Sequence, residues 1–215
     1  MNIEIRGNLS SHEPMSRHCS WRTGGPAERY FEPADLDDLI EYLRNVGENE
    51  QITWIGLGSN VLIRDGGVNG TVISTTKTLN KFRWLTSNTL YVECGTPCAK
   101  VAKEAVRMNV AGGAFLAGIP GSIGGALAMN AGAFGSEIWM LVDNVQLIDR
   151  DGTANEEPSA NIETTYRQVD LEPDRWFLSA VLRFEKNTEQ FGEETLVGMV
   201  WKPMKRVRQS GALAT

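Results

Sequence analysis

The residues most suited to chemistry are the glycines, serine and asparagine of two short loops. The first loop reads Gly56-Leu57-Gly58-Ser59-Asn60 and follows an apolar run that is typical of a strand. Glycines allow backbone N–H groups to turn toward an anion, and Ser59 and Asn60 add short polar groups. The spacing matches neither a dinucleotide-binding Gly-x-Gly-x-x-Gly motif nor a phosphate-binding Gly-Lys-Ser/Thr loop. By itself the loop therefore fits a structural turn better than a ligand site.

The second loop is longer, reading GIPGSIGGA over residues 118–126 and continuing as MNAGAFG over residues 129–135. Its small residues allow a large flat ligand to lie against the backbone. The N–H groups of Ser122–Gly125 can meet a pyrophosphate at the start of a helix. The alternative is a Gly/Ala-rich helix packed in a core, and the residues alone favour neither interpretation.

Charge and cysteine content narrow the functional class. The 215 residues carry a formal net charge of −6, which argues against a nucleic-acid-binding face. The basic stretch from Lys202 to Arg208 is interpreted as a solvated helix end. Three cysteines cannot all pair, so Cys19, Cys94 and Cys98 are predicted to be reduced, and no metal site is expected. With no apolar leader or membrane-spanning run, a cytoplasmic location without membrane contact is predicted.

Strand and helix signals alternate along the chain. Periodicity predicts one helix from Ala34 to Leu43 and another from Pro97 to Met108, with a third in the tail from Glu189 to Arg208. Strands are predicted at residues 28–32, 52–55, 70–75, 81–86, 89–94, 144–149 and 176–185. The mixed order with hairpins favours an α+β fold. A shift in composition suggests two lobes: a small N-terminal α/β lobe over residues 1–77 and a larger α+β lobe over residues 78–215.

Four segments, in order, resemble the MurB family of bacterial cell-wall flavoenzymes, the UDP-N-acetylenolpyruvoylglucosamine reductases. The second loop and its continuation look like that family's GIPG-x-x-GG-A-x-x-MNAG signature. Trp21 to Ala27 resembles an early glycine-pair segment, and Gly56 to Leu62 resembles a Gly-Ser-Asn loop. Tyr166-Arg167 resembles the family's Tyr-Arg pair. The resemblance covers roughly residues 8–185.

The resemblance implies a two-lobed FAD-binding fold of the vanillyl-alcohol-oxidase (PCMH) type, with non-covalent FAD between α+β lobes. It also implies which residues bind the cofactor. These are Gly24, Gly25, Gly56, Gly58, Ser59, Asn60, Gly118, Ile119, Pro120, Gly121, Ser122, Gly124, Gly125, Asn130, Ala131 and Gly132.

The implied reaction is the NADPH-dependent reduction of UDP-N-acetylglucosamine enolpyruvate to UDP-N-acetylmuramate, a step of peptidoglycan synthesis. Hydride travels from NADPH through the flavin to the enolpyruvyl double bond, and an acid protonates the adjacent carbon. Arg167 is the catalytic candidate, since a permanently charged guanidinium suits a carboxylate that gains electron density.

Members of the family continue for roughly another hundred residues, which carry a serine proton donor and a supporting glutamate. Neither element is found near Ser210-Gly211, so the family's C-terminal substrate domain is expected to be absent. The leading hypothesis is a truncated reductase that holds FAD with weak or no turnover. The alternatives are a flavin- or nucleotide-binding module completed by a partner chain, and another flavin enzyme of the same superfamily, such as an oxidase. Self-association is left open.

Overall fold

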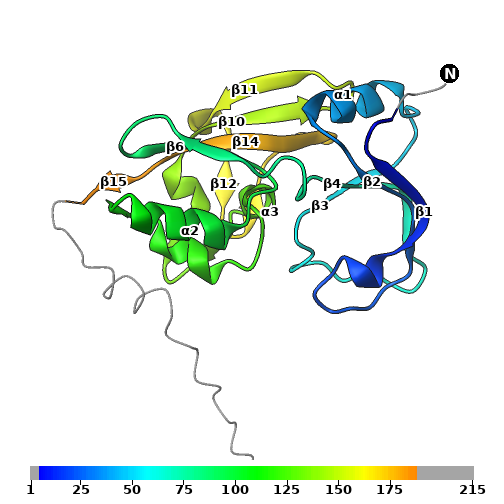
Figure 1. Cartoon of the computed structure of the whole chain (residues 1–215), viewed down its shortest axis with the longest axis horizontal. Helices are drawn as coiled ribbons and strands as arrows, with labels where there is room; N and C mark the ends of the chain where they lie inside the picture. The colour runs from blue at the N-terminus through cyan, green and yellow to red at the C-terminus, as the bar shows by residue number, and fades with distance from the viewer. Residues whose placement is uncertain (1–4, 188–215) are drawn as a thin grey trace, which may run out of the picture.

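The computed structural model describes residues 5–187, and these residues form two β-sheets that lie end to end (Figure 1). The predicted tail helix from Glu189 to Arg208 and its basic residues lie outside the described residues. Among residues 5–187, no helix is long and apolar enough to cross a membrane.

The first sheet has the strand order β1-β2-β4-β3, in which β1 runs antiparallel to β2 while β2, β4 and β3 are parallel. Helix α1 covers this sheet (Figure 1) and begins after Asp35, whose side chain accepts a hydrogen bond from the Asp38 backbone N–H at 2.9 Å. The bounds are β1 Asn8–Pro14, β2 Pro26–Glu32, α1 Leu36–Asn45, β3 Ile52–Ile55 and β4 Val68–Ser74.

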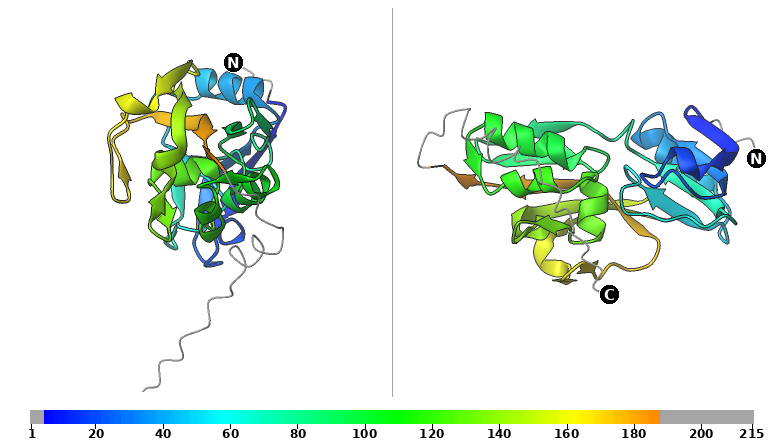
Figure 2. Two further views of the ribbon diagram at one scale, coloured as in Figure 1. Left: turned by 90° about the vertical axis from the view of Figure 1, so that its left-hand side faces the viewer. Right: turned by 90° about the horizontal axis from the view of Figure 1, so that it is seen from below.

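The second sheet is antiparallel throughout, in the order β11-β10-β14-β6-β5. Helices α2 and α3 pack on one of its faces, and apolar side chains such as Val101, Leu127 and Leu147 form the core there (Figure 2). The bounds are β5 Phe82–Trp84, β6 Thr89–Glu93, α2 Cys98–Arg107, α3 Ile123–Ala128, β10 Val142–Asp149, β11 Ala154–Pro158 and β14 Arg175–Arg183.

Three two-stranded ribbons and four short 3₁₀ helices complete the fold of residues 5–187. One of the 3₁₀ helices directly follows β1, and the other short elements lie in the second half of the described chain. The ribbons are β7 Val110–Ala111 with β15 Glu185–Lys186, β8 Gly132–Ala133 with β9 Ser136–Glu137, and β12 Thr164–Thr165 with β13 Gln168–Val169. The 3₁₀ helices are η1 Met15–Arg17, η2 Ala114–Gly118, η3 Ile138–Leu141 and η4 Ser159–Asn161.

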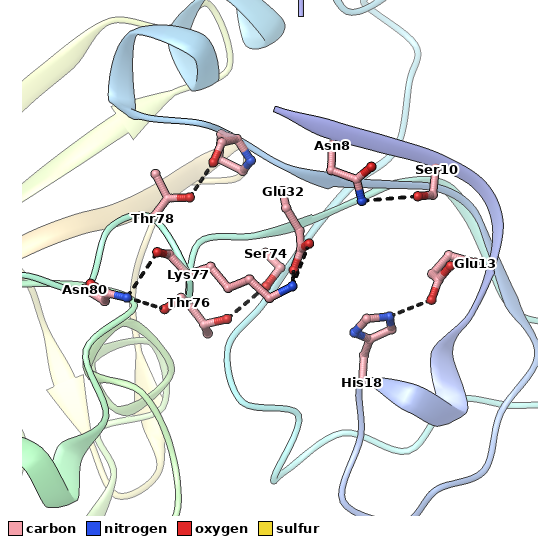
Figure 3. A network of polar contacts seen from close by, with 11 residues as sticks. Asn8, Ser10, Glu13, His18, Glu32, Ser74, Thr76, Lys77, Thr78 and Asn80 are labelled. Atoms are coloured by element: carbon pink, nitrogen blue, oxygen red, sulfur yellow. Dashed lines mark hydrogen bonds and ion pairs between the residues drawn. The ribbon is translucent and has the colours of Figure 1, made fainter. Parts of the chain in front are cut away.

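The connection from β4 to β5 is held against the first sheet by polar contacts (Figure 3). Lys77 pairs with Glu32 at 2.9 Å, and Thr78 donates a hydrogen bond to the Pro33 carbonyl oxygen. The Asn80 amide donates to the Thr76 carbonyl oxygen at 2.9 Å. The predicted boundary at residue 77 falls inside this connection, and the division into two domains stays a prediction.

A buried apolar cluster is shared by the two sheets. Phe31 and Ile73 of the first sheet and Leu39 of α1 pack in one cluster with Ile148 and Leu178 of the second sheet. Burial of such side chains is the main stabilising contribution to folding. The two sheets are therefore joined through a common core as well as through the connecting chain.

Candidate functional site

A cavity of about 500 Å³ lies where the first sheet faces the segment that leads into α3. Its volume is in the range typical of sites for large small-molecule ligands. Both predicted glycine-rich loops line it, and Arg167 lines it as well. The lining residues are Met15, Thr53, Trp54, Ile55, Gly56, Leu57, Gly58, Ser59, Asn60, Val61, Ile63, Val68, Val72, Ile119, Pro120, Gly121, Ser122, Gly125, Ala126, Ala128, Met129, Ala131 and Arg167.

The first loop directly follows β3, and its conformation requires glycine. Gly58 has φ +65°, and a Cβ atom there would collide with the His18 carbonyl oxygen. Among the hydrogen bonds of the described residues, the backbone N–H groups from Leu57 to Asn60 have no protein acceptor. Residues whose N–H groups have no acceptor within residues 5–187 therefore form part of the cavity wall, an arrangement that suits an anion.

The second loop differs from the prediction, because most of its N–H groups are used within the protein. The N–H of Ile123 donates to the Thr96 carbonyl oxygen at 2.8 Å, and that of Gly124 donates to the Cys94 carbonyl oxygen at 2.7 Å. The N–H of Gly125 donates to Ser122 Oγ at 3.4 Å, as expected for a helix capped by serine. Three of the four N–H groups predicted to meet a pyrophosphate are thus already bonded, so the unpaired donors lie mainly on the first loop.

Arg167 reaches the cavity from the tip of the β12–β13 hairpin. Tyr166 and Arg167 form the two-residue turn between the strands, and Arg167 has φ +60°, which is uncommon for a residue other than glycine or asparagine. Within residues 5–187, Arg167 is the only charged residue that lines the cavity, and none of the lining side chains there is a carboxylate. The electrostatics of the wall thus favour an anionic ligand.

Six predicted residues do not line this cavity, and four of them pack closely against other segments. Gly25 donates from its N–H to the Arg64 carbonyl oxygen at 2.9 Å, and neighbouring Gly24 has φ +118° against Ile63, which does line the cavity. A Cβ atom on Gly118 would lie 2.7 Å from Phe134, and one on Gly124 would lie 2.9 Å from Cys94 Cβ. These glycines allow close packing behind the wall, and direct cofactor contacts by them stay predictions.

The other two are Asn130 and Gly132, in the segment after α3. Asn130 is 2% exposed, and its amide is bonded to Glu137 and to Thr165. Gly132 lies opposite Glu137 in the β8–β9 ribbon. Their proposed cofactor contacts also stay predictions.

A smaller recess of about 120 Å³ shares Trp54, Gly56 and Ser122 with the large cavity. Trp54 of β3 and Trp176 of β14 stack beside it, with ring centroids 5.4 Å apart. Trp54 Nε1 is buried and has no hydrogen-bond partner among the described residues. Sequence reasoning missed this aromatic pair, because its members come from strands of different sheets.

The three cysteines are buried, and Cys94 also lines the smaller recess. All three are buried and free, and burial raises the pKa of the Cys94 thiol and of the Cys98 thiol to about 12. Thiols with such pKa values are protonated at neutral pH and are poor nucleophiles. Within residues 5–187, no group of three or more His, Cys, Asp or Glu side chains is placed to hold a metal ion.

Comparison with known proteins identifies the family. Residues 27–156 match the family model of an FAD binding domain. The chain is 45% identical over 195 residues to the UDP-N-acetylenolpyruvoylglucosamine reductase of Methylococcus capsulatus, and the match covers 91% of this chain but 64% of that relative.

Two solved structures share the fold. The UDP-N-acetylenolpyruvylglucosamine reductase (MurB) of Thermus caldophilus matches with a TM-score of 0.74 at 22% identity, covering 91% of this chain and 67% of that one. The 6-hydroxy-D-nicotine oxidase of Arthrobacter nicotinovorans matches with a TM-score of 0.61 at 12% identity, covering 86% of this chain and 44% of that one. The predicted α+β FAD-binding fold of the vanillyl-alcohol-oxidase type is thereby confirmed.

The matched family model, the curated relative and the two-sheet architecture converge on one assignment. The chain belongs to the FAD-binding domain family, and it corresponds to the part of UDP-N-acetylenolpyruvoylglucosamine reductases that carries this domain.

Proposed function

We propose that this chain binds FAD non-covalently in the large cavity, with its pyrophosphate against the first glycine-rich loop. The observation that carries the proposal is the run of unpaired N–H groups from Leu57 to Asn60 on a cavity wall without carboxylates. Backbone donors bind phosphate oxygens without needing basic side chains. An acidic protein can therefore hold an anionic cofactor at this site.

The aromatic recess supports the same proposal. FAD carries two flat ring systems, and the space beside Trp54 and Trp176 suits one of them. The unpartnered Trp54 Nε1 is a buried donor, and such donors are stabilised when a ligand supplies an acceptor. Two separate features, the loop donors and a recess beside an aromatic pair, thus fit one cofactor.

The proposed reaction is the NADPH-dependent reduction of UDP-N-acetylglucosamine enolpyruvate to UDP-N-acetylmuramate, in the cytoplasm and in peptidoglycan synthesis. The substrate rests on the relatives' name, UDP-N-acetylenolpyruvoylglucosamine reductase, while NADPH, the product, the location and the pathway are what the family resemblance implies. When bound, the flavin supplies the hydride-transfer chemistry. Arg167 is the residue proposed to bind the substrate carboxylate and to stabilise the negative charge that builds up beside it, because its cation lines the cavity.

The chain spans 64% of the length of the Methylococcus capsulatus relative, so full turnover is a separate proposal from cofactor binding. We expect NADPH to reduce the bound flavin, and the enolpyruvyl substrate not to reoxidise it. Proton donation by a positioned side chain contributes about 10²–10⁴-fold in rate, and no proton donor is assigned among the described residues.

The test is the visible spectrum of the purified chain, followed by anaerobic reduction with NADPH and addition of the substrate. Absence of stoichiometric flavin after incubation with FAD would refute the cofactor proposal. Rapid return of the oxidised spectrum, with UDP-N-acetylmuramate as product, would instead show that the chain has a complete site of its own.

A second candidate function is a flavin-binding module completed by another polypeptide. Large apolar side chains are exposed on and next to the first loop, with Leu57 44%, Leu62 71% and Trp21 69% exposed. Exposed apolar surface of this kind is typical of an interaction site. Adding the separately produced part of the Methylococcus capsulatus relative that lies outside the match tests this candidate, because a module completed by another polypeptide should gain turnover from it.

A further inference from the structure

The Asn130 side chain connects the segment after α3 with two other segments. Its Nδ2 donates to Glu137 Oε2 at 2.7 Å and to the Thr165 carbonyl oxygen at 3.0 Å. Because Nδ2 donates to both acceptors, the orientation of the amide is fixed. In the flipped orientation, Asn130 Oδ1 would face the two acceptor oxygens. Asn130 also has φ +41°, a conformation that asparagine adopts more readily than most residues.

Glu137 is held in place by the β8–β9 ribbon. It pairs with Gly132, where a Cβ atom would collide with the Ser136 carbonyl oxygen and lie 3.0 Å from Glu137 Cγ. The next N–H, of Ile138, donates to the Ala131 carbonyl oxygen at 3.0 Å. The carboxylate that accepts from Asn130 is therefore fixed by backbone packing, and its charge strengthens the hydrogen bond.

Thr165 is the last residue of β12, directly before the turn that carries Arg167. The hairpin has only two residues in each strand, and Arg167 adopts a positive φ, a conformation that is strained for a residue with a Cβ atom. A short hairpin with a strained tip needs support from outside. The hydrogen bond from Asn130 supplies such support next to the turn.

We propose that Asn130 and Glu137 are positioning residues for Arg167, acting through the Thr165 carbonyl oxygen. Glu137 orients the Asn130 amide, Asn130 holds the end of β12, and the hairpin then presents the guanidinium at the cavity. The inference rests on the proposed function for what Arg167 acts on, but the placement of the hairpin can be tested without the cofactor.

The first measurement is hydrogen exchange by mass spectrometry on the peptide spanning residues 163–170 of the FAD-free chain. Glu137→Ala removes the acceptor and Asn130→Gly removes the donor while tolerating the positive φ. Each is expected to speed exchange about tenfold or more, as loss of a charge-assisted bond implies. Glu137→Gln keeps an acceptor oxygen and is expected to retain the wild-type rates.

Glu41→Ala is the matched control, since Glu41 accepts from the Asn45 amide at 2.8 Å on the exposed surface of α1. It removes the same kind of pair without touching the hairpin. Circular dichroism checks that every variant is folded. Unchanged exchange over residues 163–170 in both folded Glu137→Ala and folded Asn130→Gly would overturn the inference.

The second measurement is the reduction potential of FAD in the loaded chain, which reports the cation. Arg167→Ala is expected to lower the potential, because a nearby positive charge favours the more negative reduced cofactor. Asn130→Gly should lower it too, and the double variant should go no lower than Arg167→Ala. If Asn130→Gly shifts the reduction potential equally in the wild-type chain and in the Arg167→Ala variant, the positioning role is overturned. A chain that takes up no FAD would refute the proposed function, while the exchange measurement would still decide the inference.

Discussion

Gly56 and Ser122 meet where the two glycine-rich loops approach each other, and a Cβ atom on Gly56 would collide with Ser122 Oγ. Ser122 also caps α3, and both residues line the large cavity and the aromatic recess. The relative placement of the two loops therefore depends on Gly56, which has no side chain, and on the hydroxyl of Ser122.

Gly56→Ala is expected to weaken FAD binding, because the new methyl group pushes the serine and the start of α3 away from the first loop. Ser122→Ala in the same chain removes the colliding oxygen and leaves its Cβ at an ordinary 3.4 Å, so it should restore much of the affinity. Ser122→Ala alone loses a helix cap and should cost about 1 kcal/mol of stability. FAD titration by flavin fluorescence measures the affinity of the two single variants and of the double variant. If the losses of binding free energy in the single variants simply add in the double variant, the close contact between Gly56 and Ser122 is contradicted.

Gly121→Asp is expected to abolish FAD binding while leaving the protein folded. A Cβ atom there has Ser59 Oγ as its nearest neighbour at 3.6 Å, so a side chain fits. A carboxylate about 4 Å from a phosphate would cost about 4 kcal/mol at the effective dielectric of such sites. Gly47→Asp adds the same charge where no atom lies within 4 Å of the new Cβ, and should bind FAD normally. Stoichiometric flavin in purified Gly121→Asp would refute the site.

Stability should fall in alkaline solution because of the buried thiols. Burial holds the pKa of Cys94 and of Cys98 near 12, against 9.0 for an ordinary thiol, so the folded chain keeps protons that the unfolded chain releases above pH 9. Each thiol then lowers the free energy of unfolding by roughly 1 kcal/mol per pH unit as the pH rises above 9. Urea unfolding at several pH values should show a shallower loss in the Cys94→Ser, Cys98→Ser double variant, with unchanged flavin content. An equal slope in both proteins would contradict the assignment.

Arg150→Ala should destabilise the fold by about 1–3 kcal/mol. Its guanidinium lies at the end of the second sheet and donates to the Gly47 and Glu50 carbonyl oxygens at 2.8 and 2.6 Å, beside the first sheet. Arg183→Ala is the control, since that side chain is 60% exposed and pairs with Asp143 at the surface, where such pairs contribute less than about 1 kcal/mol. Similar losses for the two variants in urea unfolding would argue against a joint between the sheets.

The elements with a strong local pattern could be predicted from the sequence. The strand predicted at residues 52–55 is β3, and the helix predicted from Ala34 is α1, whose apolar spacing and Asp35 cap are local features. Strand β1 was missed, because Asn8–Pro14 is polar and mostly exposed, and only its pairing with β2 makes it a strand. Its extended form depends on a partner strand rather than on its own composition.

The site was predictable to a similar degree. The glycine-rich loops and Arg167, which the family resemblance singled out and their residue types alone did not, line one cavity. No strand was predicted between residues 149 and 176, where the β12–β13 hairpin lies, since strands of two residues leave no periodicity to detect. The N–H groups of Ile123 and Gly124 were assigned to a ligand because their acceptors, at Thr96 and Cys94, come from a distant segment.

The apolar cluster shared by the two sheets restricts how a cofactor can enter. Phe31 and Ile73 could part from Ile148 and Leu178 only by exposing buried surface on both sheets, so hinge opening between them is strongly disfavoured. A large ligand must therefore enter through the opening of the cavity, and the cavity is formed before the ligand binds. We therefore expect the chain to stay folded when the cofactor is lost and to take it up again without a refolding step.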